Sequence, residues 1–233
     1  MRSVKSAFLG FFDVVVTGDI DDVARRVAAH PALATVSLDE GATRREASTF
    51  FLTEIAHYVY AGDTALHVAA AAFRRQVAEL LMAKGADCRA KNRRGAEPLH
   101  YAADANHWNP TLQAEVIEYL VSVGADPNAL DGSGVAPLHR AVRTRSLAAV
   151  RALVEAGANP TRQNKAGSTP LHLAVQNTGR GGSGSPLARL EQAGIVRLLL
   201  EHGARPTDRD RRGTQVYQAA TSDWIRTLLA EAG

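Results

Sequence analysis

The chain has 233 residues, of which 45% are hydrophobic and 22% charged, and its formal net charge is +3. This composition excludes a disordered chain and supplies enough apolar material for a core. The single cysteine, Cys88, excludes an internal disulfide and a four-cysteine zinc site, and no apolar run approaches the roughly 18 residues of a membrane span. We therefore expect a soluble, monomeric protein of a reducing compartment, the cytoplasm.

The first predicted elements are two helices. Residues 1–16 combine a basic start with an apolar stretch, but Asp13 interrupts that stretch and no small-residue cleavage site follows. A first helix is therefore expected in place of a signal peptide. A turn at Gly18 leads to a second helix with acidic residues in its first turn, where the helix dipole favours them.

Residues 39–61 match no repeat pattern and hold four of the chain's 13 aromatic side chains. We expect these aromatics to pack the segment against the element that follows. The alternative is an exposed anchor for a partner. The four side chains are Phe50, Phe51, Tyr58 and Tyr60.

From residue 62 onward four segments repeat one another. Each is followed by a Gly-Ala pair, and the connector from that pair to the next leading glycine is 10 residues long every time. The length variation therefore lies inside the units, where the second and fourth carry insertions of 6 and 13 residues. The segments are GDTALHVAA from Gly62, GAEPLHYAA from Gly95, GVAPLHRAV from Gly134 and GSTPLHLAV from Gly167.

These segments resemble ankyrin repeats in the T-P-L-H-x-A signature and in a 33-residue period, which the first and third units keep. The resemblance is firm over residues 62–233 and loose over residues 8–38. It implies an all-α ankyrin-repeat solenoid, in which helix-turn-helix units with β-turn fingers stack on one another. It also implies that fingertips and concave helix faces recognise a partner protein.

Local signals agree with this assignment. In the fourth unit Thr169 is placed to cap the first helix, with Pro170 at the first helical position. The second helix ends where Gly203 can adopt a left-handed conformation. One unit cannot bury its apolar face alone, so we expect caps at both ends of the stack.

The predicted organisation has four parts. They are degenerate N-terminal capping helices in residues 1–38, an irregular aromatic-rich insertion in 39–61, four repeats in 62–94, 95–133, 134–166 and 167–212 with insertions near 104–111 and 178–190, and a C-terminal capping repeat in 213–233.

A histidine recurs in every unit. In ankyrin repeats this histidine links the turn to the neighbouring unit, so we assign His67, His100, His139 and His172 to the fold. His100, Asp104 and His107 share the spacing of one helical face and would suit a metal. Because His100 already has a structural role, we expect neither a metal nor another cofactor.

The stretch NTGRGGSGSPL, residues 177–187, contains a GxGxxG spacing. A dinucleotide-binding loop must leave a strand and open a helix, but a helix precedes this stretch, so that interpretation fails. Two interpretations remain: a flexible solvated loop, or a weak anion site before the next helix, which Ser185 and Pro186 would begin.

Both insertions fall between the two helices of their units, and they flank the third repeat. Surface loops tolerate insertions, but long loops are also often functional. An alternative function is therefore the binding of a small anionic or phosphorylated ligand at this inter-helix edge, where Arg189 and the segment His107-Trp108 would also lie. The candidate residues are Arg143, Arg145, Arg180, Gly181, Gly182 and Ser185.

The fingers concentrate basic charge. Of the 27 basic residues only four are lysine, and arginine suits forked contacts with carboxylates. The first finger (residues 85–95) and the fourth (residues 203–213, which includes Arg205) are rich in arginine, although Asp208 and Asp210 partly neutralise the fourth. The other interpretation is that these charged side chains only keep the exposed ends of the fingers solvated. The candidate partner-binding residues are Arg89, Lys91, Arg93, Arg94, Asp104, Lys165, Arg209, Arg211 and Arg212.

Two further classes of function receive no support from the sequence. The basic residues are too interspersed with acidic ones for a nucleic-acid track. The chain contains no GxSxG, HExxH or P-loop motif, and no nucleophile with a matching base. The sequence predicts a non-catalytic scaffold that binds an acidic partner protein and no membrane.

Overall fold

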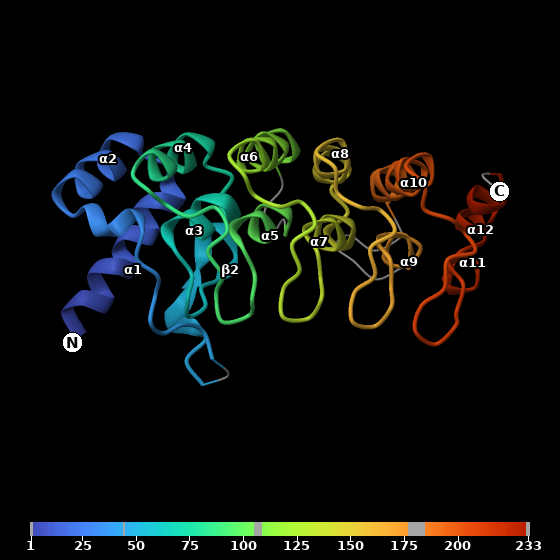
Figure 1. The fold of residues 1–233 in the computed structure, drawn as a ribbon, viewed down its shortest axis with the longest axis horizontal. Coiled ribbons are helices and arrows are strands. Elements are labelled where there is room, and N and C mark those ends of the chain that lie inside the picture. Colours follow the sequence, from blue (N-terminus) through green and yellow to red (C-terminus); the bar gives the residue numbers. More distant parts are fainter. Residues whose placement is uncertain (1, 44, 105–108, 177–184, 232–233) are drawn as a thin grey trace. The chain divides into compact units, whose positions relative to one another are not determined.

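A computed structural model describes residues 2–43, 45–104, 109–176 and 185–231. Helices dominate these residues, as Figure 1 shows, and the chain divides into two compact units, Met1–Asp126 and Pro127–Gly233. No helix among the described residues is long and apolar enough to span a membrane.

The first unit consists of helix pairs in two layers. The helices α1, α3 and α5 form one layer, and α2, α4 and α6 form the other, since α3 packs against both α1 and α5 and α4 packs against both α2 and α6. The elements outside residues 39–61 are α1 (Arg2–Thr17), α2 (Ile20–Ala29), the 3₁₀ helix η1 (Pro31–Ala34), α3 (Ala65–Ala71), α4 (Arg75–Ala83), α5 (Pro98–Ala103) and α6 (Pro110–Ser122).

The second unit repeats this arrangement. The short helix α9 packs against α7 and α11, and the longer α10 packs against α8. The elements are α7 (Pro137–Thr144), α8 (Leu147–Glu155), α9 (Pro170–Ala174), α10 (Pro186–Glu201), α11 (Val216–Ala219) and α12 (Asp223–Glu231).

The helices begin and end at the predicted signals. The Thr169 side chain accepts a hydrogen bond from the amide of His172, and Pro170 is the first residue of α9. Ser185 caps α10 by accepting from the amide of Ala188 at 3.1 Å. Positive φ angles of 90°, 107°, 89° and 96° follow the second helices, as predicted, at Gly85, Gly124, Gly157 and Gly203.

The core of each unit is built from the repeated motif. The leucine of each T-P-L-H segment is completely or almost completely buried, because it lies on the face that the first helix turns toward its neighbours. These leucines are Leu66, Leu99, Leu138 and Leu171. In α1 the buried rings of Phe11 and Phe12 supply the corresponding apolar face.

Residues 39–61 contain a small hairpin. Its strands β1 (Phe51–Leu52) and β2 (His57–Tyr58) are antiparallel, and two 3₁₀ turns, η2 (Ser48–Phe50) and η3 (Thr53–Ile55), adjoin them. Phe50 is buried, whereas the paired rings of Phe51 and Tyr58, 4.7 Å apart, are 36% and 41% exposed. The aromatics therefore divide between packing and exposure.

Candidate protein-binding fingers

A histidine of the preceding repeat holds the first, third and fourth fingers. The ring Nδ1 of His172 accepts from the amide of Thr169 at 3.2 Å, and its Nε2 contacts the carbonyl of Thr214 at 3.2 Å. His67 and His139 reach the carbonyls of Ala96 and Ser168 in the same way, both at 3.1 Å. The predicted structural role is confirmed for His67, His139 and His172.

Burial lowers the pKa of His139, so its ring is neutral at pH 7. A neutral ring accepts at Nδ1 and donates at Nε2, which is the pattern that the two contacts of each linking histidine require.

A second device fixes the fingers, and the sequence reasoning missed it. An Asn or Asp lies three residues before Gly95, Gly134, Gly167 and Gly213, and its side-chain oxygen accepts hydrogen bonds from two nearby backbone amides. The side-chain oxygen closes a local turn, so the finger keeps one conformation. The recurring position was a detectable signal, because it is occupied by Asn92, Asp131, Asn164 and Asp210.

Neighbouring fingers are also joined through the backbone. The amide of Arg93 donates to the carbonyl of Ala61 at 2.8 Å, and that of Arg211 donates to Ala166 at 3.2 Å. Gly167 permits this approach, since a Cβ on it would lie 2.3 Å from the Arg211 nitrogen. The backbone therefore joins the first finger to the 39–61 segment, and it joins the fourth finger to the third (residues 157–167).

This geometry agrees with the comparison with known families. The family model "Ankyrin repeats (3 copies)" matches residues 42–131 and 111–210. The chain belongs to the ankyrin-repeat family. Ankyrin repeats are generally protein–protein interaction modules, and the predicted all-α fold of stacked ankyrin repeats is confirmed. In the comparison with curated proteins, nothing matches this ankyrin-repeat chain.

In the first finger the predicted partner-binding cations differ in the contacts that their side chains make within the protein. Arg89 is exposed, whereas Lys91 lies 3.7 Å from a carboxylate oxygen of Glu97. The guanidiniums of Arg93 and Arg94 lie 5.5 and 4.8 Å from the ring centroid of Tyr60, and Arg93 also donates to the carbonyl of Ala42. Cation–π contacts hold these two arginines beside the 39–61 segment.

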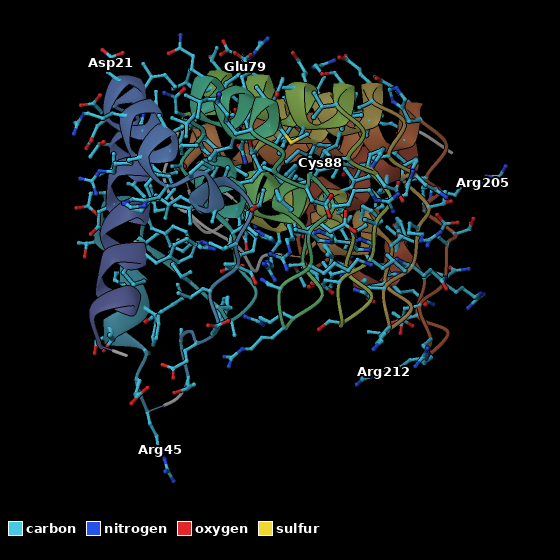
Figure 2. All side chains as sticks on the ribbon, turned by 60° about the vertical axis from the view of Figure 1, so that its left-hand side comes forward. Asp21, Arg45, Glu79, Cys88, Arg205 and Arg212 are labelled. Carbon is cyan, nitrogen blue, oxygen red and sulfur yellow. The ribbon has the colours of Figure 1, made fainter. Side chains whose placement is uncertain are left out.

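The fourth finger presents its cations more openly. Arg205, Arg211 and Arg212 are exposed, and Figure 2 shows the side chains of Arg205 and Arg212 extending away from the ribbon. Within the described part of the chain no carboxylate lies at ion-pair distance from these three. Arg209 donates to the carbonyl of Gly213 at 2.7 Å.

The aspartates of this finger serve its own backbone. Asp208 accepts from the amide of Arg205, and Asp210 accepts from the amides of Thr214 and Arg212. The bond from Thr214, followed by that from Arg212, lowers the pKa of Asp210, which remains ionised. These carboxylates are therefore occupied by the turn, although their charge still offsets part of the local potential.

Two predicted partner-binding residues lie in other surroundings. The ammonium group of Lys165 donates to the carbonyl of Gly132 at 2.5 Å, which joins the third finger (residues 157–167) to the second (residues 124–134). Asp104 is the residue after α5, and its amide donates to the carbonyl of Tyr101. Neither residue therefore belongs to the group of exposed arginines on the first and fourth fingers.

The inter-helix edge is described only in part. Arg143 is exposed, but Arg145 is 5% exposed, adopts a left-handed conformation after α7 and donates to the carbonyl of Gln176 at 3.2 Å. Arg180, Gly181 and Gly182 lie outside the described residues, as do His107 and Trp108. Among the described residues no group of three or more His, Cys, Asp or Glu side chains could hold a metal ion.

Glu97 replaces the capping threonine of the second repeat and is fully buried. Neither of its carboxylate oxygens has a hydrogen-bond partner among the described residues. Burial raises its pKa, while Lys91 and Arg89 oppose the rise. A carboxyl with a raised pKa favours folding at pH values below its unfolded pKa, about 4.3, and this contribution is lost as the pH rises through the folded pKa.

Replacing Glu97 with threonine is therefore expected to stabilise the protein by about 1–2 kcal/mol at pH 7. A threonine hydroxyl would engage His100 as the Thr169 hydroxyl engages His172, at 2.9 Å. The gain should be smaller at pH 4, where Glu97 is protonated. Urea denaturation at both pH values measures this gain in stability. A loss of stability at pH 7 would contradict the conclusion that the buried Glu97 carboxylate destabilises the fold.

Proposed function

We propose that this ankyrin-repeat protein is a non-catalytic scaffold that recognises an acidic partner protein through the first and fourth fingers and the helices of the layer beside them. The observation that carries the proposal is the state of Arg205, Arg211 and Arg212, which are exposed on a fixed turn and have no carboxylate at ion-pair distance in the described chain. Guanidiniums in this state form forked hydrogen bonds with a partner's carboxylates.

The first finger supports the same proposal with a different surface. The ring of Tyr60 restrains Arg93 and Arg94, so less side-chain entropy is lost when they bind. Arg89 adds an exposed cation. We assign recognition to both fingers without requiring one continuous contact surface, and we place the protein in the cytoplasm as a monomer.

The alternative, a small anionic ligand at the inter-helix edge, receives less support. Of its described candidates, Arg145 is buried against the carbonyl of Gln176, and the hydroxyl of Ser185 is occupied by the amide of Ala188. Arg143 alone among them combines charge with exposure.

Charge reversal tests the proposal. We expect the double substitution Arg211→Glu and Arg212→Glu to remove a partner that the native protein captures from a lysate of its source cells, because repulsion replaces paired contacts. Weakening by at least tenfold corresponds to about 1.4 kcal/mol. Quantitative mass spectrometry of the captured proteins measures the loss.

The matched control changes the net charge equally on another surface. Arg151 on α8 and Arg226 on α12 are exposed arginines within their own helices. The double substitution Arg151→Glu and Arg226→Glu should leave capture unchanged. Equal losses in both double variants would indicate nonspecific electrostatics and would reject the fingers as the binding site.

A further inference from the structure

The first half of α10 carries the two most exposed of the large hydrophobic side chains in the described chain. Leu187 is 63% exposed and Leu190 is 68% exposed, whereas the other side chains of this class that reach the surface are 36% to 43% exposed. Three residues apart on a helix, the two leucines are neighbours. They form one apolar patch facing solvent.

An open groove of about 490 Å³ lies beside this patch, between α10 and α12. On α10 the lining residues recur at the three- and four-residue spacing of one helical face, and the ring of Trp224 forms the α12 wall. The lining residues are Pro186, Arg189, Leu190, Ala193, Arg197 and Trp224. They include two guanidiniums and no carboxylate.

Three of the six lining residues, Pro186, Arg189 and Leu190, belong to an N-terminal extension of α10. The helix α10 has 16 residues, whereas α8 and α12 have 9 each. When α8 and α10 are aligned on the glycines that follow them, Leu147 corresponds to Ala193, so residues 186–192 have no counterpart on α8. One side of this extension contacts α8, since the Glu191 carboxylate accepts a hydrogen bond from the amide of Leu147 at 3.1 Å.

The chain's own neighbouring segment has the wrong chemistry to cover this groove. Residues 177–184 read NTGRGGSG, which contains no large apolar side chain to bury the leucines. Its single charged residue is Arg180, which has the same sign as Arg189 and Arg197. The complementary occupant is apolar and acidic.

We propose that the groove binds an acidic amphipathic helix of a partner protein. Apolar side chains of that helix would pack on Leu190 and Trp224, with Leu187 extending the contact, and its carboxylates would pair with Arg189 and Arg197. Eight residues of α10 separate these arginines by about 12 Å, and carboxylates seven residues apart on a helix are separated by about 10.5 Å. This surface is separate from the fingers, and its assignment does not depend on them.

A selection from a displayed library of random 15-residue peptides, made against the full chain, identifies the preferred chemistry. Counter-selection uses the double variant Leu187→Ser and Leu190→Ser, whose substitutions are on the surface and should leave stability within about 0.5 kcal/mol. Circular dichroism checks that the variant is folded. We expect the surviving peptides to combine an apolar centre with acidic residues seven or eight positions apart.

Fluorescence anisotropy of the best peptide then measures affinity. We expect at least tenfold weaker binding to the leucine variant and to Arg197→Glu, and unchanged binding to the control Arg151→Glu. A peptide with lysines in place of its acidic residues should bind the double variant Arg189→Glu and Arg197→Glu, a rescue that a merely structural role would not give.

Several results would overturn the proposal. One is a selection in which no peptide prefers the native chain to the leucine variant, and another is enrichment of basic or uncharged peptides. A third is a concentration-dependent dimer in sedimentation velocity that the leucine variant lacks, because the occupant would then be a second copy of this chain.

Discussion

Replacing Gly167 with alanine is expected to destabilise the second unit by about 3 kcal/mol or more, because two costs combine. Its φ of +78° lies in the left-handed region, which costs an alanine about 1–2 kcal/mol. The added Cβ would also lie 2.3 Å from the backbone nitrogen of Arg211, so the third and fourth fingers would have to separate. Urea denaturation followed by circular dichroism measures the change.

Gly213 provides the control for this substitution. It has a similar φ, +81°, but a Cβ on it would meet nothing within 4 Å. Gly213→Ala should therefore cost only the backbone term, about 1–2 kcal/mol. Limited proteolysis should show that the Gly167 variant loses protection first in α11 and α12, since repeats are stabilised by their neighbours. Equal unfolding midpoints for the two variants would contradict the close contact between fingers.

Replacing Arg140 with methionine should have the second large effect. Its guanidinium lies 2.8 Å from a carboxylate oxygen of Asp131, and both side chains are largely buried. Removing one partner of such a pair leaves a buried charge and costs about 3 kcal/mol. The double variant with Asp131→Asn should cost less than Arg140→Met alone, because an amide oxygen can still accept from the amides of Ser133 and Val135.

The same pair predicts a dependence on pH. Burial by itself would raise the pKa of Asp131, but hydrogen bonds from Arg140 and from the amides of Val135 and Ser133 outweigh it and hold that pKa below its ordinary value. The stabilisation that ionised Asp131 contributes is therefore complete above the pKa of Asp131 in the unfolded chain, about 3.9. It is lost as the pH falls through the pKa of Asp131 in the folded protein. Arg140→Met should show a smaller acid-induced loss from this group.

An exposed ion pair supplies the comparison. Arg226 lies 3.0 Å from Asp223 on α12, where the side chains are 44% and 98% exposed. Arg226→Met should change the free energy of unfolding by less than about 0.5 kcal/mol. If Arg226→Met and Arg140→Met cost the same, burial would not be the source of the Asp131–Arg140 contribution.

The sequence was sufficient where structure depends on short-range chemistry. Thr169 and Pro170 begin α9, and Gly203 follows α10 with a positive φ, because capping depends on residues a few positions apart. The linking histidines could be assigned from a resemblance that repeats in register. These features need no knowledge of which distant segments meet.

The features that the sequence did not predict depend on long-range contacts. The ring of Tyr60 lies beside Arg93 and Arg94 only because residues 39–61 fold against the first finger. Arg145 is only a candidate anion-binding residue in the sequence, and the fold buries it and places its guanidinium on the Gln176 carbonyl. The candidate fingers were predicted as a group, but which of their cations remain free depends on such pairings.

The most direct test of the central claim places a photo-cross-linking amino acid at Thr207, an exposed residue of the fourth finger, and at Thr227, an exposed residue of α12. Cross-linking in source-cell lysate followed by mass spectrometry should identify a protein joined to position 207 and not to 227, attached through an acidic segment. A protein joined only at position 227, or one joined at 207 through a basic or apolar segment, would contradict recognition of an acidic partner by the fingers.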